Sequence, residues 1–173
     1  MPTRPPPEYT DDPGTLLDET ADSLSELSKC KLDADLRAAA KDLSNFIHNV
    51  RHLSRDYQSR DDQLCAMFPI RNWLRFVPRA PDKFAAGGDF KLYLYLANYE
   101  TTMLIMGSIL PWVELPLAIP ERWTCVEKIR EFLQSQVDSI VDGDDIAGAA
   151  QTYKAYTNWM GVAEKVMNQH HFD

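Results

Sequence analysis

The stretch from Phe90 to Leu110 restricts the fold more than any other part of the chain, because its residues are apolar on nearly every side of a helix. Such a helix is stable in water only when other elements surround it, and Asp89 is a suitable cap for its first turn. The longest uncharged run, from Thr101 to Val113, has 13 residues, whereas a membrane-spanning helix needs roughly 20. The stretch is therefore predicted to be the central helix of a globular domain without a membrane anchor.

Three further segments have apolar residues three or four positions apart, the spacing that places them on one side of a helix. A fourth, with four leucines between positions 16 and 27, predicts a weaker first helix. Pro69 is predicted to open a short additional helix that reaches Phe76. No strand alternation and no internal repeat is visible, so the predicted fold class is all-α, an irregular single-domain helical bundle. The four apolar stripes consist of Leu16, Leu17, Leu24 and Leu27; of Leu36, Ala39, Leu43, Phe46, Val50 and Leu53; of Val126, Ile129, Leu133, Val137 and Ile140; and of Ile146, Ala149, Tyr153, Tyr156, Met160, Ala163 and Met167.

Length and proline content define the domain organisation. The chain has 173 residues, which fits one domain with a substantial core. Five of the 11 prolines fall within the first 14 residues, together with polar and acidic groups. A segment of this composition has no core of its own. Residues 1–14 are therefore predicted to form a disordered proline-rich tail, and residues 15–173 to form the helical domain.

Charge and cysteine content exclude several classes of protein. The formal net charge is −8, which repels nucleic acid at long range, so no direct DNA or RNA binding is expected. Cys30, Cys65 and Cys125 are too widely spaced for a disulfide framework or a clustered metal site. The first residues contain no apolar core of a secretory signal. An intracellular location, nuclear or cytoplasmic, is expected.

Residues 68–99 carry a family resemblance. They contain a proline, arginine and tryptophan turn followed by a helix rich in leucine and alanine, and the Leu110-Pro111-Trp112 stretch extends the likeness. This pattern resembles the C-terminal effector region of fungal binuclear zinc-cluster transcription factors of the sterol-uptake-regulator type, although the six cysteines of the zinc cluster are absent. The matching residues are Pro69, Arg71, Trp73, Phe76 and Pro78, then Leu94, Leu96, Ala97 and Tyr99. The resemblance implies a helical effector-like domain that acts in regulation, and in sterol-responsive members such a domain binds an apolar ligand.

Polar residues interrupt the otherwise apolar 90–110 segment and suggest a candidate ligand site. Buried polar groups need partners, so this band either pairs with other helices or lines a cavity. Neighbouring aromatic and methionine side chains would suit an apolar pocket with a few orienting polar groups. The band comprises Asn98, Glu100, Thr101 and Thr102, and the candidate ligand-binding residues are Trp73, Asn98, Tyr99, Glu100, Met103, Met106, Trp112 and Trp123.

Two functional hypotheses follow from the resemblance and the candidate site. The leading one is a stand-alone regulatory domain in the transcriptional control of fungal metabolism, acting through a protein partner or a bound hydrophobic molecule. The alternative is a cofactor-independent cyclase or isomerase of fungal secondary metabolism with Glu100 as its general acid, because burial would raise the pKa of that carboxyl. No phosphate loop, nucleophile elbow, zincin motif or dinucleotide fingerprint is present, so enzymatic activity is the less favoured hypothesis.

No metal and no cofactor is predicted. His48, His52 and Asp56 are spaced four apart and share one side of a helix, a geometry that could hold a metal. They lie opposite the apolar stripe and among positive charges such as Arg51 and Arg55, which disfavour a bound cation. These residues are therefore interpreted as a solvated face.

Overall fold

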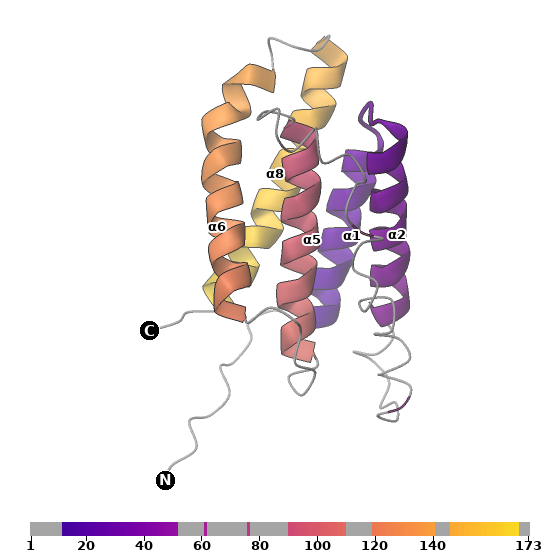
Figure 1. Cartoon of the computed structure of the whole chain (residues 1–173), viewed down its shortest axis with the longest axis vertical. Coiled ribbons are helices and arrows are strands. Elements are labelled where there is room, and N and C mark those ends of the chain that lie inside the picture. Colours follow the sequence, from indigo (N-terminus) through magenta and orange to yellow (C-terminus); the bar gives the residue numbers. More distant parts are fainter. Residues whose placement is uncertain are drawn as a thin grey trace.

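The computed structural model describes residues 12–51, 61, 76, 90–109, 119–140 and 146–169. This part of the chain is helical and contains no strand, which confirms the predicted all-α class. Figure 1 shows the helices side by side in a single bundle. Its elements are α1 (Pro13–Ser28), α2 (Ala34–Arg51), α5 (Phe90–Ile109), α6 (Ile119–Gln136), the short 3-10 helix η3 (Val137–Ser139) and α8 (Ile146–Gln169). Helix α1 begins at Pro13, one residue before the predicted end of the tail at residue 14.

Helix α5 is the centre of the bundle, as its composition predicts. It packs against α1, α2, α6 and α8, and Figure 1 shows it between α6 on one side and α1 and α2 on the other. Every residue from 90 to 106 is buried or half-buried. The chain directions follow from the colours in Figure 1: α1 and α6 run one way, and α2, α5 and α8 run the other. Each side of α5 therefore contacts a different neighbour.

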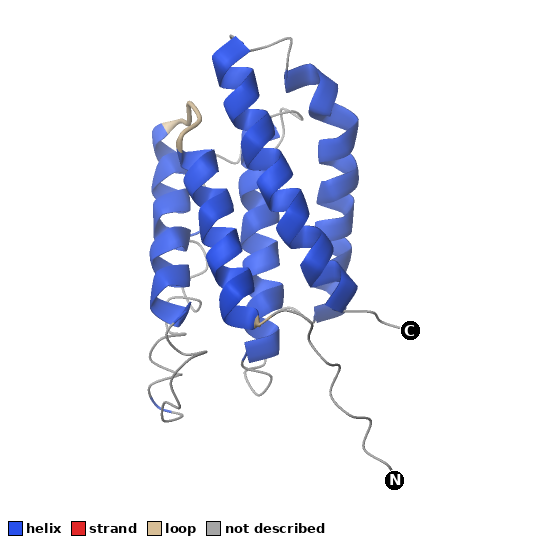
Figure 2. Cartoon of the chain, turned by 180° about the vertical axis from the view of Figure 1, so that it is seen from behind, coloured by secondary structure: helices blue, strands red, loops and turns tan. Residues whose placement is uncertain are grey.

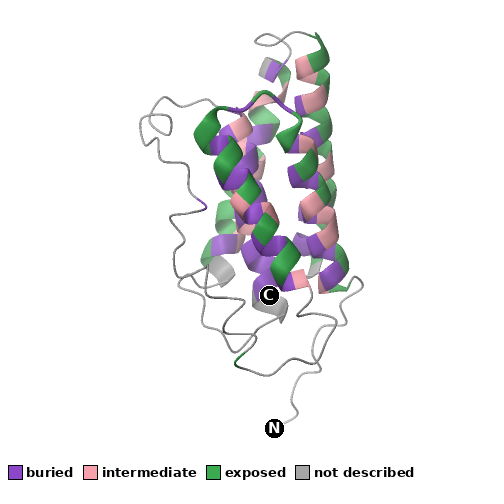
Figure 3. Cartoon of the chain, turned by 90° about the vertical axis from the view of Figure 1, so that its right-hand side faces the viewer, coloured by how far each residue is buried: buried purple, intermediate pink, exposed green. Residues whose placement is uncertain are grey.

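Helix α2 begins and packs as its sequence pattern predicts. The backbone N–H of Leu36 donates to Asp33 Oδ1 at 2.8 Å, which satisfies one of the free donors of the first turn. The predicted stripe of Leu36, Ala39, Leu43, Phe46 and Val50 is buried, whereas Leu53 lies outside the described residues. Figure 3, coloured by burial, shows that exposed residues occupy the outer surfaces of the helices.

The predicted stripe of α8 is confirmed only in part: Tyr156, Ala163 and Met167 are buried as predicted, but two other members are not. Ile146 is 91% exposed and Tyr153 is 53% exposed, although both belong to the predicted apolar stripe. Helix α8 starts beyond the end of α5 in Figure 1, so its first turn has no neighbour to bury Ile146. The buried face is set instead by the side chain with the largest apolar surface, Trp159. It consists of Thr152, Ala155, Tyr156, Trp159, Val162, Ala163, Val166 and Met167.

The upper end of the bundle is held together around Glu26 of α1. Gln151 Nε2 of α8 donates to the backbone oxygen of Glu26 at 2.9 Å and to its Oε2 at 2.8 Å. The carboxylate also accepts from Lys29 Nζ at 2.9 Å, and Lys154 Nζ lies 3.5 Å away. These contacts with Glu26 fix the axial position of α8 relative to α1.

The pH dependence of stability should include a contribution from Glu26. Hydrogen bonds from Lys29 and Gln151 lower the pKa of its carboxyl from 4.5 to about 2. Because the folded-state pKa is the lower one, ionised Glu26 stabilises the fold above pH 4.5, and this contribution is lost as the pH falls from 4.5 towards 2. Glu26→Gln should therefore flatten the plot of unfolding free energy against pH in this interval, as measured by urea denaturation. The exposed control Glu131→Gln should keep the wild-type slope; an unchanged slope in Glu26→Gln would contradict the assignment.

Gly161 occupies an exposed position on α8, and a Cβ added there would have no heavy atom within 4 Å. Glycine inside a helix costs about 0.5–1 kcal/mol relative to alanine, because it loses more backbone freedom on folding. Gly161→Ala should therefore raise the free energy of unfolding by about that amount, measured by urea denaturation. A decrease would mean that the position needs glycine for a close backbone approach.

Candidate functional site

The polar band of α5 is divided among three faces of the helix. Glu100 points to α6, where it meets Arg122. Tyr99 points to Phe76, with ring centroids 6.1 Å apart. Thr101 points to α8, where its Oγ1 accepts from Trp159 Nε1 at 3.1 Å. Because consecutive residues of a helix project about 100° apart, the predicted site residues do not all line one space.

The contact between α5 and α6 includes a buried ion pair. Arg122 Nη1 donates to Glu100 Oε2 at 2.7 Å, and the side chains are 5% and 16% exposed. Burial raises the pKa of Glu100 above its ordinary value of 4.5, while Arg122 opposes the rise. The guanidinium carbon also lies 6.0 Å from the centroid of the Tyr99 ring, within the range of a cation–π contact. Arg122 therefore joins two predicted site residues, Tyr99 and Glu100.

Arg122 and its neighbour Trp123 each have an unsatisfied hydrogen-bond donor. Arg122 Nε and Trp123 Nε1 are both buried and have no hydrogen-bond partner in the described part of the chain. A buried donor without a partner costs about 1–3 kcal/mol. The first turns of α6 thus present two N–H groups that an acceptor oxygen could satisfy.

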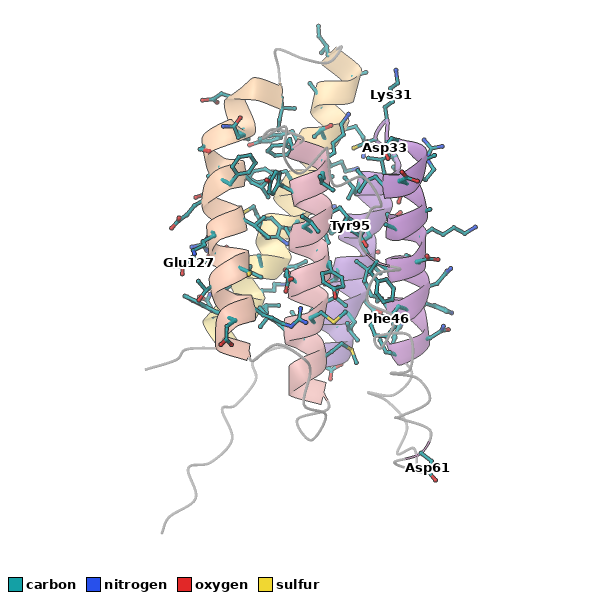
Figure 4. The ribbon with its side chains drawn as sticks, in the orientation of Figure 1. Lys31, Asp33, Phe46, Asp61, Tyr95 and Glu127 are labelled. Atoms are coloured by element: carbon teal, nitrogen blue, oxygen red, sulfur yellow. The ribbon has the colours of Figure 1, made fainter. Side chains whose placement is uncertain are left out.

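An aromatic cluster lies on the α2 side of α5. Phe76 is 2% exposed, and its ring centroid is 5.6 Å from that of Phe46. The Tyr95 hydroxyl donates to the backbone oxygen of Phe76 and lies 3.3 Å from that of Ala39. Figure 4 shows Tyr95 and Phe46 between α5 and α2. Burial raises the pKa of Tyr95 and, to a smaller extent, that of Tyr99, so both phenols stay neutral at physiological pH.

Asn98 lies on the side of α5 that the other helices cover fully. Its Nδ2 donates to the backbone oxygen of Leu94 at 2.9 Å, and Thr102 Oγ1 donates to the backbone oxygen of Asn98 at 2.7 Å. The amide oxygen Oδ1 is buried and accepts no hydrogen bond from the described residues. Asn98 is therefore a buried polar group that its own helix satisfies only in part.

The remaining predicted ligand-binding residues lie in the core, against it, or outside the described residues. Met103 and Met106 are 1% and 0% exposed, on the same side of α5 as Tyr99. Trp123 is half-buried against the core. Trp73 and Trp112 lie outside the described residues, as do the arginines at positions 71, 75 and 79.

Two residues that matter to the site were not identified in the sequence, Arg122 and Trp159. Arg122 precedes Val126 by four positions and so continues the apolar stripe of its helix, a signal that a charged residue belongs to the buried face. Trp159, Val162, Ala163 and Val166 show the same spacing of three and four. In both helices, the spacing of apolar residues indicated the buried face.

Within the described ranges, no group of three histidine, cysteine or carboxylate side chains could hold a metal ion. None of the helices that the structure describes is both long and apolar enough to cross a bilayer. No protein family, curated protein or solved structure matches this chain.

Proposed function

We propose that this chain is a helical regulatory domain that acts in the nucleus on the transcription of fungal metabolic genes, and that a bound hydrophobic molecule sets its state. The resemblance of residues 68–99 to zinc-cluster effector regions supports the regulatory part. The ligand part rests on one observation, the buried Arg122 side chain whose Nε donor has no acceptor among the described residues.

The donors at the start of α6 indicate the polar group that this ligand carries. Arg122 Nε and Trp123 Nε1 are both hydrogen-bond donors, so the ligand supplies an acceptor oxygen. The buried side chains of Tyr99, Met103 and Met106 lie on the adjoining side of α5. An apolar molecule with a single oxygen function suits these surroundings, because further polar groups would be buried without partners.

The charge of the pair restricts the ligand further. Glu100 already neutralises Arg122 across a distance of 2.7 Å. A carboxylate ligand would add a second buried negative charge to this neutral pair, and the cost of desolvating it would not be recovered. The ligand is therefore a neutral molecule whose oxygen belongs to a ketone, ester or alcohol.

A transcription reporter tests the regulatory proposal. The chain is fused to a heterologous DNA-binding domain in yeast, and reporter transcripts are measured for the wild type, Arg122→Lys and Trp123→Phe. Lysine keeps the charge opposite Glu100 but lacks the Nε donor, and phenylalanine lacks the indole N–H. Both variants should lose most of the wild-type effect, whereas the exposed control Arg37→Lys should keep it. No effect of the wild-type fusion, or equal effects of all variants, would overturn the proposal.

The enzyme hypothesis has one supporting observation, since burial raises the pKa of Glu100. A general acid must be protonated, however, and the bond from Arg122 Nη1 at 2.7 Å favours the ionised carboxylate. The regulatory function is therefore the better supported of the two. Turnover of an apolar polyene by the purified chain that disappears in Glu100→Gln would reverse this preference.

A further inference from the structure

The surface between α1 and α8 contains one carboxylate, Asp22, that has no basic partner among the described residues. Helix α1 has four acidic residues, and three of them have basic partners. Asp18 pairs with Arg51 at 2.8 Å and Glu19 pairs with Lys165 at 2.7 Å, and Glu26 is held by Lys29 and Lys154. Asp22 is exposed and has no basic partner in the described part of the chain.

Asp22 lies at the edge of an open hollow of about 250 Å³ that is lined by Glu19, Asp22, Asn158, Gly161, Val162 and Lys165. Figure 2, seen from behind, shows the two contributing helices, α1 and α8, side by side at the front. Gly161 is part of the lining, and a Cβ added there would meet no heavy atom within 4 Å, so the hollow is open at this position. A side chain of another molecule can therefore enter at this position.

We propose that this hollow is a docking site for an arginine side chain of a protein partner. Of the three charged groups in the lining, Glu19 and Lys165 neutralise each other, so the negative charge of Asp22 remains. An acidic partner would meet two carboxylates here, whereas a basic one meets a net charge of opposite sign. Asp22 on α1 and Asn158 on α8 both line the hollow, and both side chains carry acceptor oxygens. A guanidinium group, with five donors in a planar fork, suits a pair of acceptors better than a lysine ammonium does.

This site is independent of the proposed ligand at the α5–α6 interface, because it uses α1 and α8 and no residue of that interface. The partner would be recognised by the positive charge of its arginine and by the fit of that side chain in the hollow. A failure of one proposal therefore leaves the other standing, and each has its own readout.

An NMR titration of the whole chain tests the proposal. The probe is a capped alanine- and glutamine-rich helical peptide with one central arginine, and its counterpart has citrulline, a neutral isostere, in the same place. The arginine peptide should shift the amide signals around positions 22, 158 and 161. Asp22→Asn should weaken binding about two- to five-fold, the usual range for an exposed ion pair. Gly161→Leu should abolish the local shifts because it fills the hollow.

Matched controls make each outcome decisive. Glu131→Gln removes an exposed carboxylate from α6 and should bind the arginine peptide as the wild type does. Gly161→Ala fills little of the hollow and should bind the arginine peptide as the wild type does, and urea denaturation of Gly161→Leu checks that the leucine variant is folded. Equal shifts with the citrulline peptide, or shifts that survive in both Asp22→Asn and Gly161→Leu, would overturn the proposal. So would sedimentation as a dimer that Gly161→Leu dissociates, because the occupant would then be a second copy of the chain.

Discussion

Replacing Trp159 with alanine should lower the free energy of unfolding by about 3–5 kcal/mol, the range measured for removal of a large aromatic side chain from a core. Trp159 is 0% exposed and lies at the meeting point of α8 with α5. Its removal leaves a cavity and also deprives Thr101 Oγ1 of the indole donor, which is 3.1 Å away. Urea denaturation followed by circular dichroism measures the change.

Two variants separate packing from hydrogen bonding at this position. Trp159→Phe retains most of the buried apolar surface but lacks the indole N–H, and it should cost less than the alanine variant. Trp159→Phe combined with Thr101→Val removes both partners and should recover about 1 kcal/mol, since no polar group is then left unsatisfied. A loss of under 1 kcal/mol in Trp159→Ala would show that α8 does not pack against α5 as described.

Replacing Arg122 with methionine should lower the free energy of unfolding by about 3–5 kcal/mol, because it leaves the Glu100 carboxylate buried without its counter-charge. The pair is 5% and 16% exposed, so water screens it little. Replacing both residues, by Arg122→Met and Glu100→Leu, should restore most of the loss, since an apolar pair of similar volume is about as stable as a buried ion pair. A double-mutant cycle in urea measures the coupling between the two residues.

The Arg122→Met variant should also respond to pH in a diagnostic way. Burial raises the pKa of Glu100 and Arg122 opposes the rise, so loss of the arginine raises it further. A carboxyl with a raised folded-state pKa destabilises the fold increasingly as the pH rises above the ordinary value of 4.5 and through the folded-state pKa. The variant should therefore be more stable, relative to the wild type, at pH 5 than at pH 8. The same deficit at both pH values would contradict a buried carboxylate.

The sequence allowed most of the architecture to be predicted, because apolar spacing is a direct consequence of burial. A helix that is apolar on all sides must be central, and α5 is. Helix α2 is amphipathic over its whole length, and its buried face is the predicted one. In α8 the predicted stripe was right for Tyr156, Ala163 and Met167, whereas Ile146 and Tyr153 have the same helical spacing but are exposed. Spacing alone does not show where a bundle ends.

The candidate site was harder to predict for a different reason. Asn98, Tyr99 and Glu100 are adjacent in sequence, but a helix directs them to different neighbours. The residue that contacts both Tyr99 and Glu100 is Arg122, which lies 22 positions beyond Glu100. An arginine near the start of a helix is usually exposed. Its burial depends on the carboxylate opposite, and that pairing follows only from the antiparallel packing of α5 and α6.

The central proposal is that the buried Nε donor of Arg122, which has no acceptor among the described residues, holds the oxygen of a neutral hydrophobic molecule. Mass spectrometry of small molecules extracted from the purified chain, expressed in a fungal host, tests it most directly. The wild type should release a neutral, apolar, oxygen-containing molecule in nearly equimolar amount. Arg122→Lys keeps the charge opposite Glu100 but loses one buried hydrogen bond to the molecule. It should therefore release at least about tenfold less of the molecule than the wild type does. An empty wild-type protein, or equal amounts in both proteins, would contradict the account.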